Sequence, residues 1–241
     1  MGRVIMSGIV PTLKAPVTYN ANFADNDWAT IINACHKNQV PDTWVVGNSK
    51  TMLINGTEYQ IDIIGKGHDD YADGSGKAPL TFQLHDCYGE LKAMNSTNTN
   101  DGGWASCAMR STHLPAILAL MPTEVQNGIR EVNKLTSVGN QSATINTTAD
   151  KLFLLSEIEI FGSRTYSELN EGWQYAYYKA GNSKLKNDLY GDPNNWWERS
   201  PAGSESGDES LYFCMVLADG EGEAEYNNAD SPEGVPFAFC F

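Results

Sequence analysis

Two apolar segments near the end of the sequence, residues 212–217 (YFCMVL) and 234–241 (GVPFAFCF), constrain the fold more than any other feature. Both are rich in the β-branched and aromatic residues that favour strands. In the second segment Phe237, Phe239 and Phe241 occupy alternate positions, so all three would lie on one face of a strand. Because an exposed apolar edge strand promotes aggregation, we expect this strand to be buried in a sheet.

The rest of the chain mixes strand and helix patterns. Asn55-Gly56 separates two β-rich runs, and this dipeptide favours a tight hairpin because it tolerates positive φ angles. Further strands are expected at residues 80–84 and 150–156, and helices at residues 26–37, 111–121, 123–135 and 173–179, the first capped by Asn26 or Asp25 and the third by Thr123. These elements do not alternate in βαβ order, which indicates an α+β fold with short antiparallel sheets, two or more helices and long loops.

The 241-residue chain shows no second core pattern, so we expect one main domain, residues 25–241, after an extended arm at residues 1–24. Pro11 and Pro16 favour extended backbone in this arm. No apolar run reaches the roughly 18 residues of a membrane span, and the first apolar stretch is too short for an export signal. We therefore expect no membrane insertion, and no export signal is visible in the sequence.

The five cysteines are far apart in the sequence, and none forms a CxxC pair. This spacing argues against a cysteine-rich zinc site and against a disulfide scaffold. We expect mostly buried thiols that pack as small apolar side chains, with a Cys214–Cys240 bridge as the alternative.

The formal net charge is -14, and it is concentrated near the end of the chain. Residues 198–241 contain ten of the 30 carboxylates but only one of the 16 lysines and arginines, Arg199. Such a surface repels nucleic acid and anionic membranes. It either contacts a basic or polar partner or is simply a solvated face.

The sequence contains little that indicates catalysis. Residues 65–70 (GKGHDD) begin like a dinucleotide-binding loop but lack its third glycine and the helix that should follow. His68, Asp69, Asp70 and Asp73 could bind a cation or could cap backbone groups of a loop, and their spacing does not match an EF-hand. We therefore expect no enzyme activity, no resident metal and no cofactor.

The last third of the chain resembles a known family. Residues 196–201 (WWERSP), 212–216 (YFCMV), 219–220 (DG) and 234–240 (GVPFAFC) are similar to the ending of C-type-lectin-fold proteins of phages and gut-associated bacteria. Weaker similarity extends the resemblance over residues 26–241 through the segments 44–47, 63–65, 109–111, 132–134 and 150–157. The segment after Pro201 is more acidic than is typical, and Val-Pro-Phe-Ala-Phe stands where Pro-Ala-Phe is usual.

Some members of this fold family are the variable proteins of diversity-generating retroelements, in which the end of the gene is diversified. The resemblance implies a C-type-lectin-like fold with a variable binding surface at residues 195–233, built on a fixed scaffold. The implied scaffold residues are Trp196, Trp197, Arg199, Phe213, Phe237 and Phe239. The implied binding residues are Ala202, Ser204, Glu205, Ser206, Asp208, Glu209, Tyr212, Glu221, Glu223, Glu225, Tyr226 and Asn227.

We therefore expect a ligand-binding display protein of a phage tail that recognises a host cell-surface protein or glycan. It would be located in the virion, or in the bacterial cytoplasm before assembly. The arm would contact other tail proteins or form homo-oligomers. One alternative is a structural phage or prophage protein without a variable site, and another is an enzyme related to formylglycine-generating proteins. Calcium-dependent sugar binding is not expected, because the Glu-Pro-Asn-like motif of sugar-binding C-type lectins is absent from the sequence.

Overall fold

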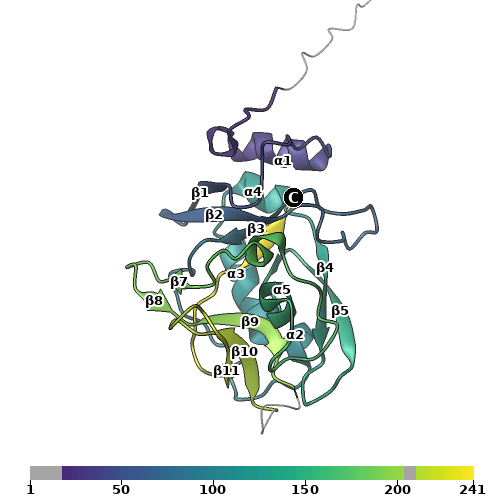
Figure 1. Ribbon diagram of the computed structural model, residues 1–241, viewed down its shortest axis with the longest axis vertical. Helices are drawn as coiled ribbons and strands as arrows, with labels where there is room; N and C mark the ends of the chain where they lie inside the picture. Colours follow the sequence, from purple (N-terminus) through teal and green to yellow (C-terminus); the bar gives the residue numbers. More distant parts are fainter. Residues whose placement is uncertain (1–17, 204–209) are drawn as a thin grey trace, which may run out of the picture.

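The computed structural model describes residues 18–203 and 210–241 and shows an α+β fold with several short antiparallel sheets (Figure 1). Most of the expected arm, residues 1–17, lies outside the described residues. Residues 18–24 do not form a free arm, because Phe23 is buried in the core within the short 3-10 helix η1 (Phe23–Asp25). The domain therefore begins before residue 25.

The largest sheet has five antiparallel strands in the order β1-β2-β3-β12-β6. Their bounds are β1 (Ser49–Ile54), β2 (Thr57–Gly65), β3 (Thr81–Leu84), β12 (Ala238–Cys240) and β6 (Leu152–Phe153). Strand β12 pairs with both β3 and β6, so Phe239 lies opposite Phe82 on one side and Leu152 on the other. The expected burial of the last strand is confirmed, although the strand is shorter than residues 234–241.

The hairpin expected at Asn55-Gly56 is confirmed. β1 and β2 pair in register across it, and the two turn residues have φ angles of 48° and 82°. Asparagine and glycine are the residues that adopt this left-handed conformation most readily.

The second sheet has the order β11-β10-β9 and lies at the end of the molecule opposite helix α1 (Figure 1). Its strands are β9 (Trp196–Pro201), β10 (Tyr212–Val216) and β11 (Ala224–Asn228). The strand expected at residues 212–217 is confirmed as β10. Two further two-stranded sheets pair β4 (Val132–Ser137) with β5 (Ile145–Asp150) and β7 (Lys186–Asn187) with β8 (Pro193–Asn194).

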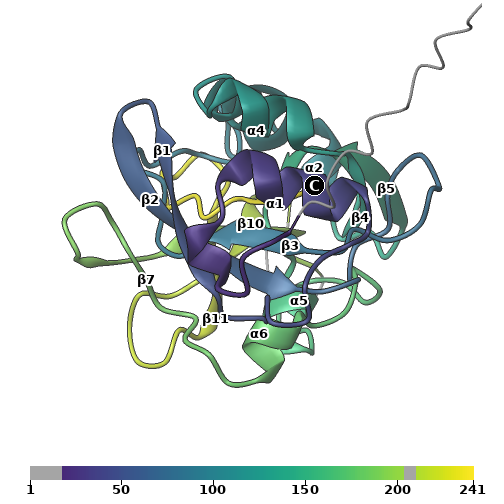
Figure 2. The same cartoon turned by 90° about the horizontal axis from the view of Figure 1, so that it is seen from above.

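The helices are short and pack around the sheets. They are α1 (Trp28–His36), α2 (Gly103–Ser106), the π-helical turn η2 (Met109–His113), α3 (Leu114–Leu118), α4 (Thr123–Gly128), α5 (Glu157–Phe161) and α6 (Ala176–Lys179). Helix α1 lies over the five-stranded sheet beside α4 (Figure 2). Asp27, rather than Asn26 or Asp25, caps α1, because its carboxylate accepts a hydrogen bond from the backbone N–H of Thr30 at 2.7 Å.

The prediction of one helix over residues 123–135 is wrong. Helix α4 ends at Gly128, where a side chain would clash with Ile32, and the chain then enters strand β4. Pro122 stands at the N-cap position of α4, and no side chain caps that end.

Three other elements are shorter than expected. Of the strand expected at 150–156, only residues 152–153 form β6. Of the helix expected at 173–179, only residues 176–179 form α6, and residues 111–118 of the helix expected at 111–121 belong to η2 and α3.

All five cysteines are free and buried, so the expectation of buried thiols is confirmed and the alternative Cys214–Cys240 bridge is wrong. The two residues lie in different sheets, Cys214 in β10 and Cys240 in β12. Among the described residues, no helix is long and apolar enough to cross a membrane.

We predict that none of the five thiols reacts at a measurable rate with a thiol reagent such as Ellman's reagent while the protein is folded. Burial raises the pKa of Cys35, Cys87 and Cys107 to about 12, so the reactive thiolate is scarce as well as inaccessible. Addition of denaturant should make all five react. Rapid reaction of any thiol in the native protein would contradict this prediction.

Candidate functional site

Three tyrosines gather at the surface of the β9–β11 sheet. Tyr212 begins β10 and Tyr226 lies in β11, and the pairing register places both side chains on the same face of the sheet. Their ring centroids are 4.9 Å apart, and Tyr166, from the loop after α5, packs edge-on against Tyr226 at 5.0 Å. All three side chains are half-buried and present part of the ring to solvent. We call Tyr166, Tyr212 and Tyr226 the tyrosine cluster.

The described acidic binding residues of the prediction lie in strand β11 and in the turn before it. Glu221 and Glu223 are exposed in the turn between β10 and β11, whereas Glu225 and Asn227 are half-buried on β11. Because side chains alternate along a strand, Glu225 and Asn227 leave β11 on the face opposite Tyr226, so the structure places them at the same edge of the sheet but not on the face of the tyrosine cluster. No sequence pattern indicates Tyr166, because its place in the cluster depends on a loop that is distant in the chain.

One predicted binding residue is wrongly assigned. Ala202 is 1% exposed, and its backbone N–H donates to the carbonyl of Tyr212 at 3.0 Å, so it belongs to the buried frame. Strand β9, although within the predicted variable segment 195–233, is buried along its whole length. Five other predicted binding residues lie outside the described residues: Ser204, Glu205, Ser206, Asp208 and Glu209.

The outer edge of β11 is capped by its own side chains. The backbone N–H of Tyr226 donates to the carboxylate of Glu225 at 3.1 Å, and that of Asn228 donates to the side-chain oxygen of Asn227 at 2.8 Å. An edge strand with free donors can recruit another strand, so these contacts disfavour strand addition. A partner would therefore contact the side chains of this surface.

The six predicted scaffold side chains are all buried. Trp196 and Trp197 have no solvent-exposed surface, and their indole N–H groups donate to the carbonyls of Lys184 at 2.9 Å and Lys92 at 2.8 Å. Because both polar groups are satisfied internally, these tryptophans act as core and are not available to stack on a ligand.

Arg199 is the centre of a buried ion network. Its guanidinium donates to both oxygens of Glu159, at 2.5 and 3.0 Å, and also to the Thr136 hydroxyl at 3.0 Å and the Leu154 carbonyl at 2.9 Å. Burial alone would raise the pKa of Glu159, but the charges of Arg199 and Lys134 outweigh it and lower that pKa. Arg199, an expected scaffold residue, thus pairs with an internal carboxylate.

Lys134 continues this network from strand β4. Its ammonium lies 2.7 Å from an oxygen of Glu159 and 2.7 Å from an oxygen of Asp69, and 3.1 Å from the hydroxyl of Tyr175. Burial opposes ionisation of Asp69, but Lys134 outweighs it and lowers the pKa of Asp69 to about 2. Four buried groups, Asp69, Lys134, Glu159 and Arg199, thus alternate in charge, and we call them the ion chain.

The cation site considered from His68, Asp69, Asp70 and Asp73 does not assemble. Asp70 pairs with Lys77 at 3.1 Å, and Asp73 pairs with Arg130 at 2.6 Å. The ligand atoms of His68, Asp69 and Glu159 do lie within 4.8 Å of one another. However, the Lys134 ammonium already lies between the two carboxylates, where a metal ion would otherwise bind.

Two further buried carboxyls lie near Arg199. Burial raises the pKa of Glu171 to about 7, and its carboxyl accepts from the Ser137 backbone N–H at 2.7 Å and from the Ser200 hydroxyl. Burial also raises the pKa of Glu198 well above its usual value, and neither of its oxygens has a hydrogen-bond partner among the described residues. Both side chains therefore favour the neutral form over a wider pH range than an exposed glutamate.

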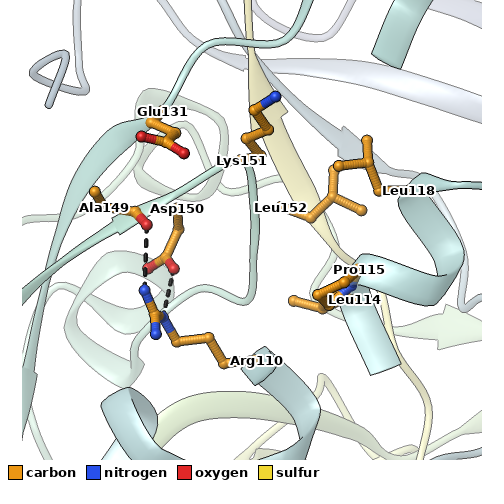
Figure 3. Close-up of a pocket in the computed structure, with 9 residues that line it drawn as sticks. All are labelled: Arg110, Leu114, Pro115, Leu118, Glu131, Ala149, Asp150, Lys151 and Leu152. Atoms are coloured by element: carbon orange, nitrogen blue, oxygen red, sulfur yellow. Dashed lines mark hydrogen bonds and ion pairs between the residues drawn. The ribbon is translucent and has the colours of Figure 1, made fainter. Parts of the chain in front are cut away.

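Surface depressions lie away from the tyrosine cluster. In one of them, Arg110 donates to Asp150 at 2.5 Å and to the carbonyl of Ala149 at 3.2 Å on its charged side (Figure 3). Its other side is apolar, formed by Leu114, Pro115, Leu118 and Leu152 (Figure 3). A second depression lies beside the ion chain, next to His68 and Trp173.

Residues 78–241 match a family model described as "Domain of unknown function (DUF6273)". The chain belongs to this family. A search of curated proteins and a search of solved structures each return no match. The DUF6273 segment contains the tyrosine cluster and three members of the ion chain, whereas Asp69 lies before it. Because β2 pairs with β3 of the DUF6273 segment and β1 pairs with β2 in the same sheet, the preceding residues complete the same domain.

We predict that Arg199→Met lowers the free energy of unfolding by about 3–5 kcal/mol, because it leaves Glu159 with only one of its two cationic partners. Chemical denaturation followed by circular dichroism would measure this loss. The control, Lys151→Met, changes an exposed side chain and should stay within about 0.5 kcal/mol of the wild type. Equal stability of the two variants would contradict the role given to Arg199.

A second prediction concerns pH. Since the pKa of Glu171 is about 7 in the folded chain against a usual value of 4.5, the folded state binds its proton more tightly. The Glu171 contribution to stability is therefore present below pH 4.5 and is lost as the pH rises through about 7. Glu171→Gln should remove this dependence, so the variant should lose less stability than the wild type across that window.

Urea unfolding at a series of pH values would measure this difference, with Glu131→Gln as a control at an exposed position. An identical loss of stability in the wild type and in Glu171→Gln would show that Glu171 does not titrate in this window.

Proposed function

We propose that the protein is a non-enzymatic ligand-binding protein that presents the tyrosine cluster and the acidic strand β11 to a partner. The observation that carries this proposal is the position of the cluster on a buried, ion-paired frame. Tyrosine provides a large contact area at a low cost in conformational entropy, and glutamate and asparagine add polar contacts. Rigid support of such side chains favours binding, because these side chains lose little conformational entropy when the partner docks.

The finer proposal is a C-type-lectin-like fold related to the variable proteins of diversity-generating retroelements. In support, the six expected scaffold side chains are buried, while Tyr212, Tyr226 and the glutamates between them are at least partly accessible. A diversified segment requires this separation, because accessible positions tolerate substitution and core positions do not.

We further propose that the partner is a host cell-surface protein or glycan and that the protein is part of a phage tail. The described chain begins beside α1, at one end of the long axis, and the β9–β11 sheet lies at the other end (Figure 1). An N-terminal attachment would therefore leave the tyrosine cluster pointing outward. The net charge of -14 favours a basic or polar partner. Added salt should weaken binding to such a partner, because it screens the attraction between opposite charges.

An enzyme of the formylglycine-generating type is less well supported. Such chemistry uses reactive cysteines, whereas all five thiols here are buried. A structural virion protein without a variable site is the remaining alternative, and the capped edge of β11 does not distinguish it from a receptor-binding protein.

The gene neighbourhood tests the retroelement proposal directly. We expect a near-copy of the DNA that encodes residues 195–241 beside a reverse-transcriptase gene. The two copies should differ at adenines in the codons of Tyr212, Glu223, Glu225 and Tyr226, and should agree in the codons of buried strand β9. Absence of a copy, or differences confined to buried positions, would contradict a diversified surface at this site.

Binding itself can be tested with the labelled protein on a panel of intact gut-bacterial isolates by flow cytometry. We predict that at least one isolate is bound, that added salt weakens binding, and that Tyr212→Ala with Tyr226→Ala reduces affinity by about tenfold or more. Lys151→Ala is the matched control at an exposed position in the depression of Figure 3. Failure to bind any isolate, or equal binding by the double variant, would contradict the proposed recognition surface.

A further inference from the structure

A depression beside the ion chain has the features of a second ligand site. It lies between His68, which follows β2, the β4–β5 hairpin and Trp173, which precedes α6. Its volume is ≈ 240 Å³. Pockets for drug-sized ligands span roughly 300–1,000 Å³, so this depression suits a smaller molecule, such as one with a single ring.

One wall of the depression is aromatic. Trp173 is 50% exposed, and its ring centroid lies 4.9 Å from that of His68. His68 in turn stacks on the buried ring of Tyr175 at 3.8 Å. The Lys77 ammonium lies 5.1 Å from the centroid of the Trp173 ring, which further positions the indole. An accessible apolar ring is therefore held in place at the edge of a cavity.

The charges around the depression are already paired with one another. Lys134 in its floor bonds to Asp69 and Glu159, and Asp70 on its rim pairs with Lys77. A charged ligand would have to compete with these contacts, because no unpaired charge lines the described part of the site. The depression therefore favours a neutral ligand.

Three neutral hydrogen-bonding side chains remain available around the opening. The ring nitrogens of His68, the amide of Asn133 and the hydroxyl of Thr147 have no hydrogen-bond partner among the described residues. Burial lowers the pKa of His68, so its imidazole is neutral at neutral pH and offers one donor and one acceptor. These groups suit a ligand that carries several hydroxyls.

We propose that this depression binds a single neutral saccharide ring, with its C–H face against Trp173 and its hydroxyls bonded to His68, Asn133 and Thr147. A pyranose combines one apolar face with a rim of hydroxyl groups, which matches an aromatic wall facing neutral donors and acceptors. This site is separate from the tyrosine cluster and does not depend on the function proposed for that surface.

Saturation-transfer difference NMR on the full chain tests this proposal with glucose, galactose, mannose and N-acetylglucosamine as probes. We expect transfer to the ring C–H protons of at least one sugar. Trp173→Ala should abolish this signal, and Thr147→Val should weaken it at least threefold by removing one hydroxyl. Tyr190→Ala, which removes an aromatic ring that is 91% exposed, should leave the signal unchanged.

Three results would overturn the saccharide site: no transfer to any of the four sugars, an unchanged signal in Trp173→Ala, or displacement of the sugar by spermidine or inorganic phosphate. The double variant Tyr212→Ala with Tyr226→Ala should retain the signal. If instead that variant alone lost it, the sugar would bind the tyrosine cluster, and the depression would be excluded while the proposed recognition surface remained.

Discussion

The buried ion chain is the interaction on which the rest of the structure depends. Asp69 follows β2, Lys134 lies in β4, Glu159 in α5 and Arg199 in β9, so four separate parts of the chain meet through alternating charges. Each member has an opposite charge within 2.7 Å. Removal of one partner from such an arrangement leaves a buried charge uncompensated, which is far more costly than the loss of a surface pair. The sheets are thereby held in one relative arrangement.

Both proposed binding regions rest on this frame, at different places. The tyrosine cluster lies on one face of β10 and β11. Strand β10 pairs with β9, which carries Arg199 of the ion chain. The His68–Trp173 depression opens directly onto Lys134 and Glu159. The DUF6273 match includes most of the frame but begins after Asp69, so the residues before the match supply both two strands of the main sheet and one end of the ion chain. The core of this chain therefore contains residues both from the family segment and from residues 18–77.

Local sequence patterns predicted those elements whose structure is determined by neighbouring residues. The Asn55-Gly56 hairpin follows from the positive φ angles of two adjacent residues, and α1 from an apolar face with a cap within one turn. The helix expected over residues 123–135 failed for the opposite reason. Residues 132–137 are compatible with either state, and pairing with β5 (Ile145–Asp150) selected the strand.

The same distinction applies to the candidate sites. The sequence by itself determined that Trp196, Trp197 and the alternating phenylalanines would be core and that the acidic residues near the end would be more accessible, because side-chain polarity and strand periodicity decide burial. Only the tertiary structure decided that Tyr166 joins Tyr226, that Ala202 is buried and that Lys134 lies between Asp69 and Glu159. These contacts join residues tens of positions apart, and no local pattern encodes the distance between them.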